Sequence, residues 1–163
     1  MSANLDLPPA PEAYKPDCFI CCKQREKAPP PGGWIYADDL VMASHANLKP
    51  DSGDQYLGWV VLETRRHTPD LASLSDEEAQ RIGLITSKIA SALKNELEAE
   101  KIYSFVIGER VAHFHLHLLP RYPNTPQEYW GARVNEWPGA ARGSEPELTA
   151  LCSRLRSRLA PPG

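Results

Sequence analysis

The sequence lacks the features that mark membrane proteins, secreted proteins and strongly charged proteins. No apolar run approaches the roughly 20 residues that span a bilayer, and the N-terminal stretch MSANLDLPPAPEAYKPD has neither the basic start nor the apolar core of a secretory signal. The formal net charge is only −3, so no general electrostatic attraction to nucleic acid or lipid is expected. We therefore expect a cytoplasmic protein without a membrane partner or a nucleic-acid partner.

Cysteine is also scarce, with Cys18, Cys21, Cys22 and Cys152 as the only four in the chain. They are too few and too clustered for a disulfide framework, and such a cluster in a reducing compartment indicates metal or redox chemistry. Cys18 and Cys21 have the C-x-x-C spacing that supplies half of a tetrahedral zinc site. The spacing alone leaves three interpretations open: a metal site, a redox pair or two packed thiols.

The length of 163 residues is enough for one hydrophobic core of ordinary size but too short for two domains that each have a core of their own. The Pro-rich residues 1–16 predict an extended arm, because proline neither propagates a helix nor fits inside a sheet. We assign residues 17–125 to the folded domain and residues 126–163 to an irregular segment with a terminal helix at 146–159.

Hydrophobic patterns predict about five strands and one long helix. In WIYADDLVMASHAN, from residue 34, two apolar runs flank Asp38-Asp39 as in a hairpin, and further strands are expected at 55–63, 102–108 and 111–121. Ser75 and Glu78 form a capping box before apolar residues that recur at three- and four-residue steps, which predicts a helix over 76–98. The fold class is therefore α+β: an antiparallel sheet of about five strands, one long helix and a C-terminal helix.

The strand expected at 111–121, VAHFHLHLLPR, places His113, His115 and His117 at alternate positions. Side chains alternate faces along a strand, so the three imidazoles should line one surface and Phe114 and Leu116 the other. Imidazole is costly to bury unpaired and titrates near neutral pH. A face with three of the chain's five histidines therefore indicates metal binding or proton and phosphoryl chemistry.

The run HFHLHLL, followed by PR, resembles the signature of the histidine triad (HIT) superfamily, His-x-His-x-His and two apolar residues. The order of features from Asp17 to Arg121 is also similar to that of the zinc-containing type, which has an N-terminal Cys-x-x-Cys. The resemblance implies a HIT-like fold, commonly dimeric. It also implies a nucleotide hydrolase or nucleotidyl transferase that cleaves at the α-phosphorus of a nucleoside phosphate, such as a dinucleoside polyphosphate or a nucleoside phosphoramidate.

The resemblance assigns catalytic and substrate-binding roles to single residues. His115, the middle histidine, would form a covalent nucleotidyl-histidine, because a neutral imidazole is a competent nucleophile at pH 7. His117 would donate hydrogen bonds or a proton to the phosphoryl oxygens or the leaving group. Asn47 matches the position that usually holds the ribose hydroxyls, and a simple turn residue is the alternative.

The resemblance also completes the metal site. In the zinc-containing members the two remaining ligands are the histidine that closes the third strand and the first histidine of the triad, which match His67 in RRH and His113. With Cys18 and Cys21 these residues imply a closed, structural zinc, because four protein ligands leave no open position for water. Cys22 is expected to pack beside this site.

Some positions depart from the family pattern. Many members carry Gly-His in the third strand where this chain has Gly58-Trp59, which leaves the chemistry at the leaving group open. Glu109 and Arg110 precede the triad where a Gln and a small hydroxyl residue are usual, and we count both as candidate substrate-binding residues because Arg110 is able to clamp a phosphate. A surface ion pair between these two neighbours is the alternative.

Two alternatives to the enzyme are considered. The replacement at Trp59 makes a zinc-stabilised nucleotide-binding module with little turnover conceivable. Nucleic-acid end processing is suggested by Arg154, Arg156 and Arg158, although their spacing is that of a solvated helix face.

The predicted sheet also bears on oligomeric state. One sheet surface and at least one edge lack a cover, which predicts a two-fold homodimer. A monomer would result if the aromatic segment after Arg121 folded back over that surface. In the same segment Trp130 and Trp137 are interpreted either as a lid or as packing residues, and His45 as a strand histidine outside the site.

Overall fold

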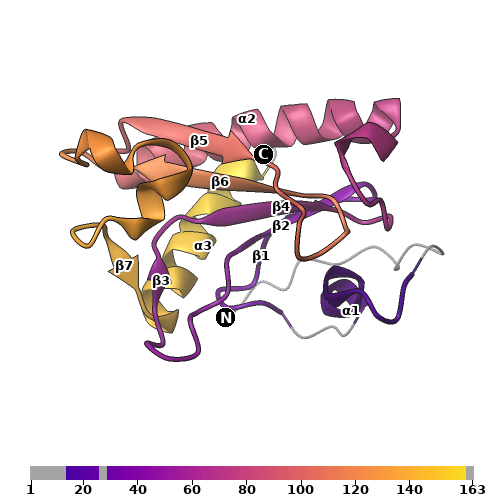
Figure 1. The fold of residues 1–163 in the computed structure, drawn as a ribbon, viewed down its shortest axis with the longest axis horizontal. Helices are drawn as coiled ribbons and strands as arrows, with labels where there is room; N and C mark the ends of the chain where they lie inside the picture. Colours follow the sequence, from indigo (N-terminus) through magenta and orange to yellow (C-terminus); the bar gives the residue numbers. More distant parts are fainter. Residues whose placement is uncertain (1–13, 26–28, 161–163) are drawn as a thin grey trace.

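The computed structural model describes residues 14–25 and 29–160. Its centre is a five-stranded antiparallel sheet in the order β1-β2-β4-β6-β5 (Figure 1). The strands are β1 (Trp34–Ala37), β2 (Val41–His45), β4 (Val60–Thr64), β5 (Lys101–Phe105) and β6 (His115–Arg121). The predicted fold class and the predicted hairpin are confirmed. Most of the expected N-terminal arm, residues 1–13, lies outside the described residues.

Two helices, α2 (Asp76–Leu97) and α3 (Glu145–Leu159), pack on one face of the sheet (Figure 1). The Ser75–Glu78 capping box is present at the start of α2, and Glu98 ends that helix in the left-handed conformation with φ 51°. The helices and the sheet share the main core, which includes Val60, Leu62, Ile85, Ile89, Leu118 and Leu151. A third helix, α1 (Phe19–Arg25), stands apart from them beside the loop that precedes β6 (Figure 1).

The strand expected at 55–63 is divided in two by a turn at Gly58. β3 (Gln55–Tyr56) pairs with β7 (Arg142–Gly143), whereas β4 joins the main sheet. Gly58 has φ +86°, and a Cβ there would lie 2.5 Å from Leu97 and 3.0 Å from Pro120. Only glycine combines this conformation with so close a contact. The prediction of one continuous strand was therefore wrong at this point.

Two other strands are shorter than predicted. β5 ends at Phe105, because Gly108 with φ +73° turns the chain toward the next loop. β6 begins only at His115, so His113 precedes the strand instead of sharing its regular pleat. The backbone beside His113 bonds to the loop after β4, since the Phe114 N–H donates to the Thr68 carbonyl at 2.6 Å.

The segment of residues 122–140 forms a second layer on the other face of the sheet. It contains the 3-10 helices η2 (Gln127–Tyr129) and η3 (Gly131–Glu136), and another 3-10 helix, η1 (Leu71–Ser73), precedes α2. Leu118 lies in the helix-side core and its neighbour Leu119 packs with Val134 and Trp137, so the two cores lie on opposite faces. Trp137 is thus a packing residue, and Trp130 stacks on the Arg121 guanidinium at 4.1 Å. No helix in the described ranges is long and apolar enough to cross a membrane.

Candidate functional site

His115 and His117 stand side by side on the sheet face opposite α2 and α3. Their ring centroids are 5.0 Å apart and the rings are nearly perpendicular, at 87°. Both line a pocket whose other walls include Phe19, Ile20, Lys23, Asn47, Val61 and Glu63. Strand pairing fixes this arrangement, because Glu63 of β4 lies opposite His115 and Val61 opposite His117.

The contacts of His115 define which of its nitrogens is available for chemistry. Its Nδ1 lies 2.7 Å from the backbone carbonyl oxygen of His113. A carbonyl oxygen only accepts, so Nδ1 must carry the proton and donate it. In the neutral ring the lone pair then sits on Nε2. His115 therefore has the tautomer that a nucleophile acting through Nε2 requires.

His117 is surrounded by rings that keep it neutral. The centroids of Trp59 and Phe105 lie 5.7 Å and 5.4 Å from the His117 centroid. Burial lowers the pKa of His117 to about 4, and the neighbouring His115 adds to the decrease. The Trp59 indole N–H donates to His117 Nδ1 at 3.0 Å. At neutral pH the ring is uncharged and held by this contact.

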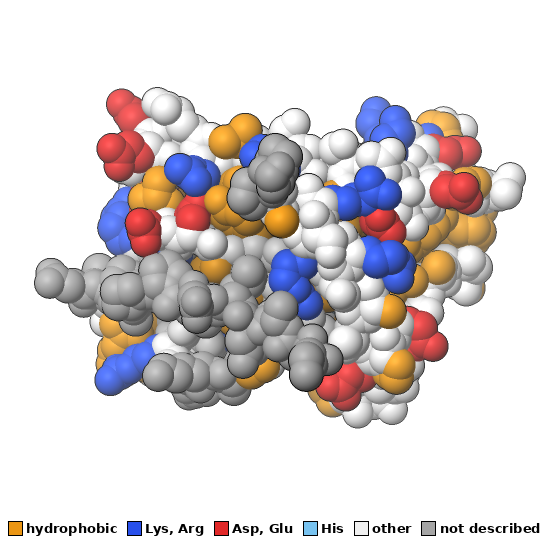
Figure 2. Space-filling model, turned by 180° about the vertical axis from the view of Figure 1, so that it is seen from behind, with side chains coloured by type: hydrophobic (Ala, Val, Ile, Leu, Met, Phe, Trp, Pro, Cys, Tyr) orange, Lys and Arg blue, Asp and Glu red, His pale blue; other side chains and the backbone are white. Residues whose placement is uncertain are grey.

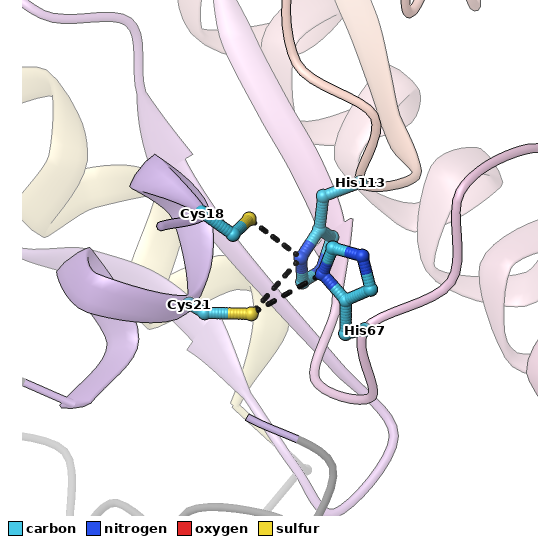
Figure 3. Close-up of side chains that lie close together, drawn as sticks. All are labelled: Cys18, Cys21, His67 and His113. Atoms are coloured by element: carbon cyan, nitrogen blue, oxygen red, sulfur yellow. Dashed lines mark hydrogen bonds between the residues drawn. The ribbon is translucent and has the colours of Figure 1, made fainter. Parts of the chain in front are cut away.

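The predicted metal ligands Cys18, Cys21, His67 and His113 come together at one point, with all four ligand atoms within 4.8 Å of one another (Figure 3). The Cys21 Sγ lies 3.4 Å from His67 Nδ1 and 3.5 Å from His113 Nδ1, and Cys18 Sγ lies 3.5 Å from His113 Nδ1. Zinc bonds of about 2.3 Å to sulfur and about 2.05 Å to nitrogen in a tetrahedron separate sulfur from nitrogen by about 3.6 Å. These three sulfur–nitrogen separations match that geometry.

The chemistry of these donors also fits zinc. His113 Nε2 lies 2.8 Å from the Thr64 carbonyl oxygen and must donate to it, which leaves the Nδ1 lone pair toward the two sulfurs. Burial raises the pKa of Cys21 to about 11, so this thiol ionises near neutral pH only when a cation is bound to it. Two cysteines and two histidines form a closed site of the structural type.

Helix α1 positions the two cysteines and excludes a third one. Cys18 directly precedes α1 and Cys21 lies in its first turn, three positions later, and both sulfur atoms lie 3.5 Å from His113 Nδ1. Cys22 lies outside the cluster: its Sγ donates to the Pro16 carbonyl oxygen at 3.3 Å. The expectation that Cys22 packs beside the metal site stays a prediction.

A buried ion pair in the pocket wall was not anticipated from the sequence. Lys23 Nζ lies 2.6 Å from Glu63 Oε2, and the Glu63 side chain is fully buried. Gln24 Nε2 donates to the other carboxylate oxygen at 3.0 Å. The only hint in the sequence was a glutamate at the end of the apolar stretch VVLE, which suggests a buried carboxylate. The sequence does not show that Lys23 of α1 pairs with it.

The remaining candidate residues occupy different places. Asn47 is exposed and lines the histidine pocket. Arg110 lies in a neighbouring hollow beside His67 and Cys18, and Glu109 is exposed on the same loop. A substrate contact of these two residues therefore stays a prediction. His45 is a strand residue as expected, but it also lines the pocket and accepts a hydrogen bond from the Gly58 N–H at 2.9 Å.

The basic residues of α3 bond within the chain. Arg154 and Arg158 both pair with Glu96, and Arg156 donates to the backbone carbonyl of Trp34. Figure 2 shows acidic and basic side chains interspersed over the described part of the face seen from behind. This distribution gives no support to a nucleic-acid surface on α3.

Comparison with known families and proteins gives a consistent result. The family model described as HIT domain matches residues 30–124. An uncharacterized HIT-like protein of Mycoplasma genitalium is 30% identical over 70 residues, which are 40% of this chain and 50% of that protein. The chain thus matches about half the length of this curated relative.

Solved structures share the fold at low sequence identity. A Hit-like protein of Bartonella henselae, described as involved in cell-cycle regulation, superposes with a TM-score of 0.66 at 21% identity, over 91% of this chain and all (100%) of that chain. A zinc-bound histidine triad family protein of Mycobacterium smegmatis gives 0.58 at 21% identity, over 86% and 96%. A hypothetical histidine triad nucleotide-binding protein of Sulfolobus tokodaii gives 0.58 at 13% identity, over 77% and 81%.

Proposed function

The chain belongs to the HIT family, and on this premise we propose that it is a nucleotide hydrolase or nucleotidyl transferase that acts at the α-phosphorus of a nucleoside phosphate. The observation that carries the proposal is the tautomer of His115. Its Nδ1 is tied to the His113 carbonyl, which leaves the Nε2 lone pair for attack on a substrate in the pocket.

The reaction proceeds in two displacements. The His115 Nε2 lone pair forms a bond to the α-phosphorus, and the bond between phosphorus and the leaving group breaks with its electron pair going to the leaving group. Water or another acceptor then attacks the phosphorus and loses its proton to the solvent or to the departed leaving group, while the P–N bond breaks and its electron pair returns to Nε2. During both steps Nδ1–H donates to the His113 carbonyl, which stabilises the positive charge on the substituted ring.

The walls of the pocket suit the nucleoside part of such a substrate. Phe19, Ile20 and Val61 offer apolar surface for a base, and Asn47 presents an amide for the ribose hydroxyls. Lys23 places an ammonium group at the same wall, where it is paired with the buried carboxylate of Glu63.

Cys18, Cys21, His67 and His113 would hold a structural zinc beside this pocket. When bound, the metal supplies a cross-link between α1 and the start of β6, with no open position for water. The protein's own contribution is the position of His113, whose carbonyl orients the nucleophile His115 and whose ring is a metal ligand. The zinc-bound relative from Mycobacterium smegmatis supports this assignment.

The proposal is tested by incubation of the protein with labelled dinucleoside polyphosphates and nucleoside phosphoramidates. An enzyme of this kind releases a nucleoside monophosphate and carries covalent, acid-labile label during turnover, because phosphoramidate bonds hydrolyse in acid. Because Trp59 replaces the histidine that many family members carry, a nucleotide-binding module with little turnover is the second candidate. Saturable binding with neither label nor product would identify that module and contradict the enzyme.

We also propose that the chain forms a two-fold homodimer through the edge strand β5. This strand ends the sheet, and Val106 and Ile107, directly after it, are 37% and 58% exposed. Residues 122–140 pack on Tyr103 and Phe105 but leave Val106 and Ile107 uncovered, so that a second chain is able to cover them. Light scattering at micromolar concentration should give about twice the chain mass of 18.1 kDa. A mass near that of one chain would contradict the dimer.

A further inference from the structure

We propose that Trp59 is a positioning residue that holds His117 in the Nε2–H tautomer, so that His117 offers a hydrogen-bond donor to the substrate beside the nucleophile. The inference rests on the proposed function for its catalytic consequence. It concerns the position where this chain departs from the Gly-His of many HIT proteins, and it gives that departure a chemical role.

The direction of one hydrogen bond sets the tautomer of His117. The indole nitrogen of tryptophan only donates, and Trp59 Nε1 lies 3.0 Å from His117 Nδ1. His117 Nδ1 must therefore carry a lone pair, and the single proton of the neutral ring must be on Nε2. A second proton on Nδ1 would place two N–H groups against each other, so the same contact also disfavours the imidazolium form.

The surrounding rings fix the orientation of the His117 imidazole. Trp59, Phe105 and His115 surround His117 with centroid distances of 5.7, 5.4 and 5.0 Å. A half-turn of the imidazole would exchange Nδ1 for a carbon and leave the indole N–H of Trp59 without its acceptor, which disfavours that orientation. The ring is thus held in one orientation as well as in one tautomer.

The neighbouring His115 and His117 are held in opposite tautomers. The His113 carbonyl forces His115 to carry its proton on Nδ1, and Trp59 forces His117 to carry its proton on Nε2. One ring therefore presents a lone pair and the adjacent ring presents an N–H on the same face. The lone pair attacks the α-phosphorus while the N–H donates to an oxygen that gains negative charge. No proton needs to be redistributed before the reaction.

Two replacements at residue 59 test this inference. Trp59→Phe removes the indole N–H and keeps an aromatic ring. Benzothienylalanine at residue 59 keeps the shape of tryptophan and replaces the N–H by sulfur, which guards against a variant that fails only because it packs poorly. The matched control is Trp130→Phe, since the Trp130 indole is partly exposed and donates to the Thr125 carbonyl outside the pocket.

The direct readout is long-range nitrogen–proton correlation NMR of histidine side chains. In the wild type and in Trp130→Phe, His117 should show only the Nε2–H form with Nδ1 as a hydrogen-bond acceptor. In both residue-59 variants the Nδ1 signal should move to that of a nitrogen without a donor, and a population with Nδ1–H should appear. An unchanged His117 spectrum in these variants would overturn the inference.

The kinetic readout separates positioning from binding. Both residue-59 variants should lose roughly 10- to 100-fold in kcat with little change in KM, because the misplaced donor acts on the developing charge. Unchanged kcat alongside a changed tautomer would also overturn the inference. If the wild type turns over none of the nucleotides, the proposed function fails, and the NMR spectra still decide whether Trp59 sets the tautomer.

Discussion

Replacement of His115 by alanine is expected to abolish turnover and covalent labelling, with kcat lowered by at least about a thousandfold, because only this ring supplies the attacking lone pair. The variant should keep its thermal unfolding midpoint within a few degrees, since the His115 ring is only half-buried. The measurement is product release from a labelled dinucleoside polyphosphate, with thermal unfolding followed in parallel.

His117→Ala is the matched control for that experiment. It removes a neighbouring imidazole from the same strand and pocket, yet it leaves the nucleophile in place. Labelling should persist, but its rate should fall roughly a hundredfold, because one hydrogen-bond donor to the transition state is lost. Normal labelling of His115→Ala combined with none in His117→Ala would mean that the nucleophile is assigned to the wrong histidine.

Loss of the metal should have the largest effect on stability. Cys21→Ser removes a ligand whose sulfur lies 3.4 Å from His67 Nδ1 and 3.5 Å from His113 Nδ1. We expect one zinc per wild-type chain and none in the variant, with the free energy of unfolding lowered by on the order of 5 kcal/mol. Elemental analysis and thermal unfolding with and without a chelator measure both quantities.

Cys22→Ser provides the comparison on the same helix, since its sulfur contacts the Pro16 carbonyl and not the cluster. This variant should retain one zinc per chain and wild-type stability. The metal assignment would be refuted by wild-type protein that contains no transition metal after zinc has been supplied, or by an unfolding midpoint that a strong chelator leaves unchanged.

Elements with strong local signals were predicted correctly from the sequence. The capping box at Ser75 and the apolar periodicity after it fixed the long helix to within one residue of its observed end at Leu97. The break at Gly58 was missed because Gln55 and Tyr56 pair with β7, which is far away in sequence, while β4 joins the main sheet. Gly58 itself was a signal for a bend inside QYLGWVVLE, since glycine weakens a strand and often marks such a break.

The cluster of four possible metal ligands could be predicted because the spacing of Cys18 and Cys21 and the resemblance to zinc-containing family members lie in the sequence itself, and the structure brings the four side chains together. The Lys23–Glu63 ion pair could not be predicted from the sequence, because it joins α1 to β4 and no local sequence pattern marks it. Trp59 was visible only as a departure from the family pattern, and its bond to His117 depends on the pairing of β4 with β6. Long-range pairing is therefore the information that the sequence motifs lacked.

The central claim is a covalent bond between His115 Nε2 and a nucleotidyl group. Rapid quenching of the reaction at high pH, followed by digestion and mass spectrometry under acid-free conditions, tests it most directly. One nucleoside monophosphoryl group is expected on the peptide that contains His115, present during turnover and lost after substrate is exhausted. Steady product release with no adduct on that peptide, or with the adduct on another residue, would contradict the account.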